Sequence, residues 1–182
     1  MRTPAKRKRD GSGQPTGDHR LTPDHVLDVV RSIAPIDLDP CSNQYSRVRA
    51  KHSICRSKVS CGLKADWSDY VHDGIAFVNP PWSSPKPWLT KCAELQMADL
   101  PAIAWVPSST ECQWFVPIWR YASAICFVQG RVHHANPAAP KDSEAGNGQG
   151  NVMVLFSNSD DLIARFRAHG SLGPVVTQWR QQ

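Results

Sequence analysis

Short apolar runs alternate along this chain with stretches in which apolar residues recur at helical spacing. The runs lie at residues 36–39, 75–78, 101–106, 122–128 and 151–156. They are short and rich in β-branched or aromatic residues, which predicts buried strands rather than helices. Several are closed directly by a proline, which cannot donate a hydrogen bond to a neighbouring strand and therefore ends the run.

Four of the intervening segments predict helices. The first begins with Thr22 as its N-cap and Pro23 as its first helical residue, and Pro35 ends it. Residues 43–61 and 132–150 lack periodicity and predict loops. The alternation of helices and strands predicts an α/β domain with a doubly wound, mostly parallel sheet. The other predicted helices are one from Pro85 capped by Ser84, one over 110–121 kinked at Pro117, and one over 160–169 ended by Gly170.

The run at 75–78 is followed by Asn79, Pro80, Pro81 and Trp82. Pro80 biases Asn79 toward an extended conformation, so its carboxamide should project from the carboxyl end of the strand. Ligands of open α/β sheets bind at that edge. An Asn-Pro turn between a strand and a helix is also a common structural feature, but a second proline and a large ring favour a functional site.

Such a group suits transfer to an exocyclic amino group. The nitrogen of a base amine is a poor nucleophile, because its lone pair is delocalised into the ring. The amide oxygen of Asn79 and the carbonyl of Pro80 can both accept hydrogen bonds from that amine. Two acceptors placed in this way direct the lone pair toward an electrophile, and Trp82 offers a face on which a planar base can stack.

Positive charge is concentrated in two parts of the 182-residue chain, whose net charge is +5. Residues 1–20 hold six Lys and Arg against two Asp, which predicts a disordered basic tail ahead of a single domain at 21–182. This tail would attract nucleic-acid phosphate or be a solvated extension without a specific role. A second basic stretch contains no acidic residue and predicts a DNA-facing patch or a solvated loop: Arg47, Arg49, Lys51, Arg56, Lys58 and Lys64.

Cysteine spacing and hydropathy limit the other possibilities. The six cysteines form no Cys-x-x-Cys pair, and reduced thiols in a cytosolic protein are expected. His52, Cys55 and Cys61 match no standard zinc spacing, so no metal is expected. No apolar run approaches the ~20 residues of a membrane helix. These features together predict a cytoplasmic location.

The order of several short motifs resembles the phage-type Dam-like DNA N-6-adenine methyltransferases. The chain carries Thr-Pro at 22–23, Asp-Leu-Asp-Pro-Cys at 37–41, Gly-Leu-x-x-Asp-Trp at 62–67 and Phe-Val-Asn-Pro-Pro-Trp at 77–82. A Gly-Arg pair and a Val-Met-Val-Leu-Phe strand follow at 130–131 and 152–156. The resemblance implies an S-adenosylmethionine-dependent enzyme on a Rossmann-like sheet that methylates adenine N6 in DNA, in the bacterial host cytoplasm if it is phage or prophage encoded.

The resemblance also implies roles for individual residues. The catalytic residues would be Asn79, Pro80, Pro81 and Trp82. The cofactor would contact Thr22, Pro23, Asp39, Pro40, Cys41 and Asp66. The DNA would contact Arg47, Arg49, Lys51, Arg56, Lys58 and Arg131.

One departure from the methyltransferase pattern follows the first strand. Many of these enzymes have a glycine-rich turn there, whereas this chain continues Cys41-Ser42-Asn43-Gln44. Asp39 could equally cap its own turn, and Asp66 could be a surface acid before a packed Trp67. Two other functions stay open from the residues alone: methylation of cytosine N4 or a protein glutamine, and non-catalytic nucleic-acid binding.

Overall fold

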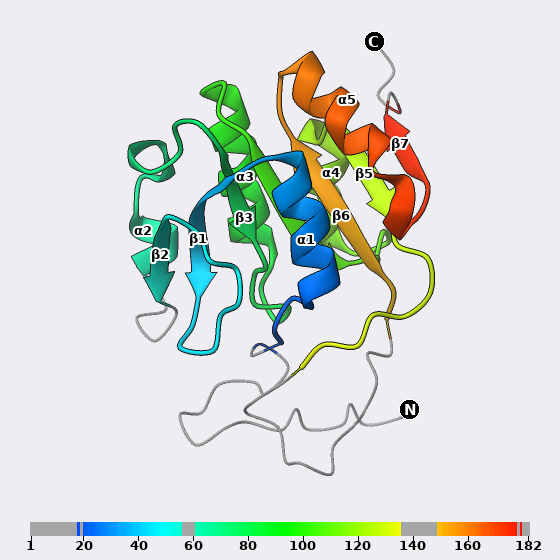
Figure 1. The fold of residues 1–182 in the computed structure, drawn as a ribbon, viewed down its shortest axis with the longest axis horizontal. Coiled ribbons are helices and arrows are strands. Elements are labelled where there is room, and N and C mark those ends of the chain that lie inside the picture. The colour runs from blue at the N-terminus through cyan, green and yellow to red at the C-terminus, as the bar shows by residue number, and fades with distance from the viewer. Residues whose placement is uncertain (1–17, 19, 56–60, 136–148, 178, 180–182) are drawn as a thin grey trace.

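A seven-stranded sheet with the strand order β2-β1-β3-β4-β6-β5-β7 forms the centre of the protein. The computed structural model describes residues 18, 20–55, 61–135, 149–177 and 179 (Figure 1). The expected tail therefore lies outside the described residues, apart from positions 18 and 20. The strands are β1 (Ile36–Ser42), β2 (His52–Cys55), β3 (Ile75–Val78), β4 (Ala102–Pro107), β5 (Ala124–Phe127), β6 (Asn151–Phe156) and β7 (Val175–Thr177).

The sheet is mixed but mostly parallel. β2, β1, β3 and β4 pair in parallel, and β6 then pairs antiparallel with both β4 and β5. β7 is antiparallel to β5, so only β6 and β7 oppose the other strands. This arrangement confirms the predicted α/β class and matches a Rossmann-like methyltransferase fold.

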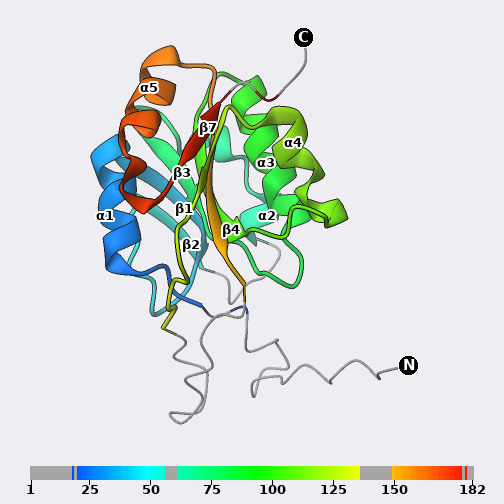
Figure 2. The ribbon, with the colours of Figure 1, turned by 90° about the vertical axis from the view of Figure 1, so that its right-hand side faces the viewer.

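Helices cover both faces of the sheet, as expected for a doubly wound domain (Figure 2). On one face lie α1 (Asp24–Ile33) and α5 (Asp160–Ala168), the latter followed by the 3-10 turn η5 (Gly170–Leu172). On the other lie α2 (Cys61–Lys64), the 3-10 turns η3 (Trp67–Asp69) and η4 (Gln113–Phe115), α3 (Lys86–Met97) and α4 (Val116–Tyr121).

Two hydrophobic cores result from the alternation of side chains along the strands. In β3, Ala76 and Val78 belong to the core under α3, whereas Ile75 and Phe77 belong to the core under α1. All four are fully buried, which explains why this strand has no polar residue until Asn79. The predicted apolar stripe of α3 is also confirmed as buried: Trp88, Leu89, Cys92, Ala93 and Leu95.

The expectation that residues 43–61 are mostly loop holds for 43–51 but missed two elements. Residues 52–55 form β2, which pairs in parallel with β1, and residues 61–64 form α2. His52 and Ser53 are exposed because β2 is an edge strand, so its sequence lacks the apolar run used to predict strands. β7, a three-residue strand at the other edge, was missed for a similar reason.

The predicted helix starts also need correction. Thr22 is not an N-cap: Pro23 occupies that position in α1 and makes no side-chain cap hydrogen bond. The N-cap of α3 is Pro85 rather than Ser84. Pro117 does not kink a long helix but lies in the first turn of the short α4, where a missing N–H costs nothing.

A buried carboxylate joins β1 to the turn before β3 at the amino edge of the sheet. Asp37 Oδ2 accepts hydrogen bonds from the backbone N–H groups of His72, Asp73 and Gly74, at 3.0, 3.0 and 2.7 Å. Lys51 Nζ lies 2.8 Å from Asp37 Oδ1. Burial acts to raise the pKa of Asp37, but the lysine and the backbone donors outweigh it and lower that pKa. This contact fixes β3 relative to β1, and with it the carboxyl end where Asn79 lies.

Candidate active site

Asn79 directly follows β3 at the carboxyl edge of the sheet, with its side-chain amide held in one orientation. Nδ2 donates to the carbonyl of Arg20 at 3.0 Å and to Thr22 Oγ1 at 3.1 Å. A backbone carbonyl can only accept, so the atom facing Arg20 must be the nitrogen. Among the described residues both hydrogen bonds of this amide use Nδ2, which leaves Oδ1 able to accept from another molecule.

The residues just before α1 pack against the motif at 79–82. The side chain of Asp18 is buried and accepts from the backbone N–H of Ser83 at 3.0 Å and from its Oγ at 2.7 Å. Leu21 N–H donates to the carbonyl of Ala135 at 2.9 Å. Asp18 and Arg20 therefore lie against the folded domain, although the sequence placed them in the tail.

Trp82 is partly buried between two side chains from distant parts of the sequence. The guanidinium of Arg20 lies 4.8 Å from the centre of its ring, a cation–π contact. The His134 ring meets it edge-on at 5.2 Å and 80°. The Nε1 atom of Trp82 is buried and has no hydrogen-bond partner among the described residues.

His134 connects Trp82 to the core of the sheet. Trp105 Nε1 donates to His134 Nε2 at 2.8 Å, and His134 Nδ1 lies 3.1 Å from the carbonyl of Val132. Because Nε2 accepts, the proton must be on Nδ1, which donates to that carbonyl. Burial, and then the nearby charge of Arg20, lower the pKa of His134 to about 4, so the ring is neutral at pH 7.

Several of the residues predicted to contact the cofactor line one small cavity beside Asn79. Its volume is about 20 Å³, and Thr22, Asp39 and Cys41 are in its wall together with Asn79. These three predicted residues are thus brought together with the predicted catalytic residue. The remaining wall residues are Arg20, Leu21, Asn43, Ser46, Arg47 and Val48.

Asp39 is buried at the end of β1 and turns back on its own loop. Oδ1 accepts from the backbone N–H of Cys41 at 3.0 Å, and Oδ2 accepts from Ser46 Oγ at 2.9 Å. This bond to Cys41 is the local cap that was considered as its alternative role. Asp39 nevertheless lies in the cavity wall, so capping and ligand binding are compatible here.

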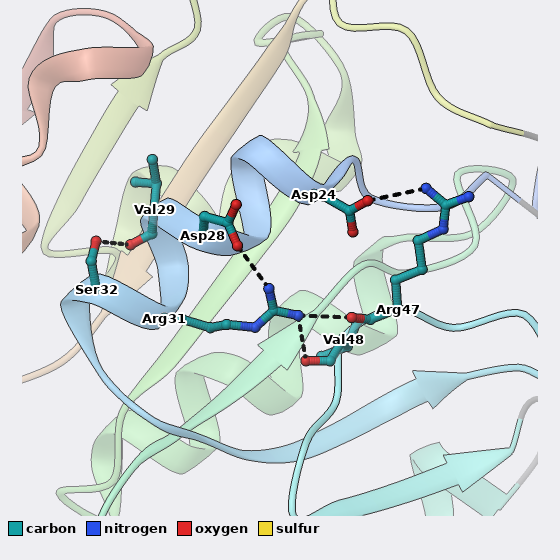
Figure 3. A network of polar contacts seen from close by, with 7 residues as sticks. All are labelled: Asp24, Asp28, Val29, Arg31, Ser32, Arg47 and Val48. Carbon is teal, nitrogen blue, oxygen red and sulfur yellow. Dashed lines mark hydrogen bonds and ion pairs between the residues drawn. The ribbon is translucent and has the colours of Figure 1, made fainter.

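The residues that close this cavity are tied to α1 (Figure 3). Arg31 Nη2 donates to the carbonyls of Arg47 and Val48, at 2.8 and 3.2 Å, and its Nη1 pairs with Asp28. The Arg47 side chain pairs in turn with Asp24 at 3.3 Å. α1 therefore holds the segment that lines one side of the cavity.

Asp66 is not in the cavity wall. It is exposed and caps η3, accepting from both the N–H and the Oγ of Ser68, and these bonds lower its pKa. Gly62 lies so close to the Pro40 carbonyl that a Cβ there would clash. Trp67 Nε1 donates to the Gly62 carbonyl at 2.7 Å. The Gly-Leu-x-x-Asp-Trp motif thus makes packing contacts against the end of β1.

The basic residues predicted to face DNA are spread over the surface. Arg49 is exposed and has a left-handed φ of 54°. Lys51 lies at the amino edge of the sheet, away from Asn79, and pairs with Asp37. Arg56 and Lys58 lie outside the described residues.

Arg131 lies in a groove of about 560 Å³ that adjoins the Asn79 region. Its wall includes Pro23, next to Thr22, and His133, next to His134. The groove is therefore next to the Asn79 site in sequence at two places, Pro23 and His133. The other wall residues are His25, Val128, Gln129, Val132, Ser171 and Leu172.

Comparison with known families decides the identity of this site. A family model described as DNA N-6-adenine-methyltransferase (Dam) matches residues 12–169, which span both the site and most of the sheet. The chain belongs to this family. No curated protein and no solved structure matches the chain. The protein is therefore an adenine-specific DNA methyltransferase that uses S-adenosylmethionine.

The donors and acceptors around the cavity suit this cofactor, but the volume does not accommodate it. Asp39 can accept from hydroxyl or ammonium groups, and Arg47 can pair with a carboxylate. A cavity of about 20 Å³ holds roughly one water molecule. A cofactor site at this position would require the segment at 43–48 or the one at 20–22 to move.

Metal and membrane contacts were also considered for this methyltransferase. In the described part of the chain, no three or more His, Cys, Asp or Glu side chains are placed to hold a metal ion. The side chains of Cys55 and Cys61, two of the three residues considered for zinc, lie outside the described residues. No helix among the described residues is long and apolar enough to cross a bilayer.

The sequence analysis missed Arg20 and His134, which contact Trp82, and Asp18, which binds Ser83 directly after the motif. Asp18 and Arg20 belong to a basic, glycine-containing stretch whose composition predicts a tail. His134 belongs to a stretch without periodicity. The one available signal was the bulk of Trp82, because a large ring at a strand end needs partners on its sides.

Proposed function

We propose that Asn79 is the group in this methyltransferase that accepts a hydrogen bond from adenine N6. The observation that carries this assignment is the orientation of its amide, whose Nδ2 is engaged by Arg20 and Thr22 and whose Oδ1 is not. As methyl transfer begins, the N6 lone pair must leave conjugation with the ring. An acceptor held in place favours that change without having to reorganise.

The transfer itself is a single displacement. S-adenosylmethionine supplies a methyl group on a positively charged sulfur. When bound, it would provide the methyl carbon to the N6 lone pair and would leave as a neutral thioether. The nitrogen then loses one proton to water, and Asn79 Oδ1 and the Pro80 carbonyl hold the amine through this change. Trp82 contributes a ring on which the base can stack, while its Nε1 stays buried.

The cofactor is assigned to the cavity shared by Asn79, Thr22, Asp39 and Cys41. Support comes from its position against Asn79 and from the buried carboxylate of Asp39. Pro23 and Pro40 border it through their chain neighbours. The Asp66 carboxylate stays with Ser68, and its neighbour Trp67 donates to the carbonyl of Gly62, which lies against Pro40.

The DNA is assigned to the groove that contains Arg131 and to the surface near Arg47. The groove carries Arg131 and two imidazoles, one of them from His133, whose chain neighbour His134 contacts Trp82. Phosphate contacts of this kind position the duplex, while the flipped base enters beside Trp82. Arg49, Arg56, Lys58 and the tail would add charge without sequence preference. A DNA substrate supports a cytoplasmic location, in the bacterial host if the enzyme is phage or prophage encoded.

Replacing the amide tests the assignment. Asn79→Ala should reduce methyl transfer by at least about 10²-fold, because a positioned acceptor is lost. Calorimetry on the same variant measures S-adenosylmethionine binding, which should weaken far less than transfer although Asn79 lines the cavity assigned to the cofactor. Unmethylated duplex DNA is incubated with labelled cofactor and digested to nucleosides, and N6-methyladenine is measured.

Asn158→Ala is the matched control. Asn158 Nδ2 donates to Gln96 and Asp99 at the opposite edge of the sheet, so this variant loses stability but should keep its transfer activity. An Asn79→Ala variant that retains wild-type turnover contradicts the catalytic role. N4-methylcytosine without N6-methyladenine would instead support the cytosine reading.

A further inference from the structure

We propose that His134 is a positioning residue that holds Trp82 in the orientation in which the target base meets it. This inference rests on the proposed function of Trp82. Nothing in the motif itself fixes that ring, because its Nε1 has no partner among the described residues. Its orientation depends on the side chains that touch it.

The connection begins at Trp105 in the middle of β4. This residue is fully buried and pairs with Met153 of the neighbouring β6, so the strands on either side hold it. Its Nε1–H is a fixed donor at the edge of the core. The donor sets the distance and the direction of His134 through the 2.8 Å hydrogen bond to Nε2.

A second hydrogen bond fixes the rotation of the His134 ring. Nδ1–H donates to the carbonyl of Val132 at 3.1 Å, and Val132 is itself buried. An imidazole with both nitrogens engaged has one allowed plane. That plane meets the Trp82 ring at 80°, the edge-to-face arrangement that aromatic pairs prefer.

The positive charge of Arg20 explains why residue 134 is a neutral imidazole rather than a cationic side chain. Arg20 stacks on Trp82 at 4.8 Å, so a lysine or arginine at 134 would place a second cation against the same ring. A neutral His134 provides an aromatic edge and accepts from Trp105 without that repulsion. The backbone hydrogen bond from Leu21 to Ala135 keeps the two segments together.

Two variants separate the ring from its hydrogen bonds. His134→Ala removes the ring and its two hydrogen bonds, whereas His134→Phe keeps a ring beside Trp82. We expect His134→Ala to lower kcat on duplex DNA on the order of ten- to a hundredfold, the range that follows from misplacing a group by about 1 Å. KM for S-adenosylmethionine should not change, and His134→Phe should recover much of kcat. His72→Gln, exposed at the amino edge of the sheet, is the control with wild-type kinetics.

A spectroscopic readout tests the position of Trp82 without any turnover. In ¹⁵N-labelled protein the indole resonance of Trp82 is identified by its loss in Trp82→Phe. It should move in His134→Ala, and a long-range ¹H–¹⁵N spectrum of the wild type should show the Nδ1–H tautomer.

The outcomes are distinct for the two proposals. An unchanged kcat in folded His134→Ala, an unmoved Trp82 resonance, or the Nε2–H tautomer each overturns the positioning role. If wild-type protein transfers no methyl group to DNA, the proposed function fails instead, and the resonance of Trp82 alone decides the role of His134.

Discussion

Lowering the pH should destabilise this methyltransferase through His134. Its pKa is about 4 in the folded protein and about 6.5 when unfolded. Below pH 6.5 the unfolded chain binds a proton that the folded protein refuses, so stability falls with pH and the loss is complete near pH 4. Above pH 6.5 both states are neutral and the contribution vanishes. At 1.36 kcal/mol per pKa unit, the loss is about 2 kcal/mol at pH 5 and about 3 kcal/mol by pH 4.

The assay is urea unfolding of the wild type and of His134→Gln between pH 7 and pH 4. The variant lacks the titrating group, so its deficit at pH 7 should shrink by about 2 kcal/mol at pH 5. Arg20, His25 and His133, whose charges face His134, are present in both proteins and cancel. So does Asp37, whose lowered pKa makes both proteins less stable in acid. A stability difference that does not depend on pH would refute the burial and charge argument for His134.

Three further predictions concern the motif, the tail and the amino edge. Trp82→Ala should lower turnover by an amount equivalent to roughly the 1–3 kcal/mol of one base stack. Trp82→Phe should recover much of the lost turnover, and an equal loss in both variants would argue against stacking. Removing residues 1–17 should weaken DNA binding and make its affinity less dependent on salt, while sequence preference persists. Filter binding at several salt concentrations measures this dependence. If the slope of log affinity against log salt is unchanged, the tail makes no phosphate contacts. Asp37→Asn should cost about 1–3 kcal/mol in urea unfolding, more than Lys51→Met, because three backbone donors lose a charged acceptor whereas the lysine is half exposed.

The central part of the fold was predictable because its strands are buried on both faces. Residues 75–78 and 152–156 are apolar throughout, and the strands that contain them have the predicted bounds. The edge strands were not predictable in this way. His52 and Ser53 of β2 face solvent, so that strand exists through its hydrogen bonds to β1 rather than through burial.

The candidate site also has one part that was predictable from the sequence and one part that was not. Thr22, Asp39, Cys41 and Asn79 were predicted from separate motifs, and the sheet brings them to one cavity because their segments end at the same edge. The partners of Trp82 were not predictable. Arg20 and His134 are far apart in sequence and reach that ring only through tertiary contacts, which leave no periodic signal.

The hydrogen bonds of the Asn79 amide restrict how this enzyme can change over evolution. The motif of the resembling DNA amino-methyltransferases has aspartate, asparagine or serine at this position. Here an aspartate would set a carboxylate oxygen against the Arg20 carbonyl and would lose the donor to Thr22. The Thr22 hydroxyl could donate to the aspartate instead, so only the contact with the Arg20 carbonyl would be lost. A change from Asn79 to aspartate therefore requires the backbone at position 20 to move away from position 79.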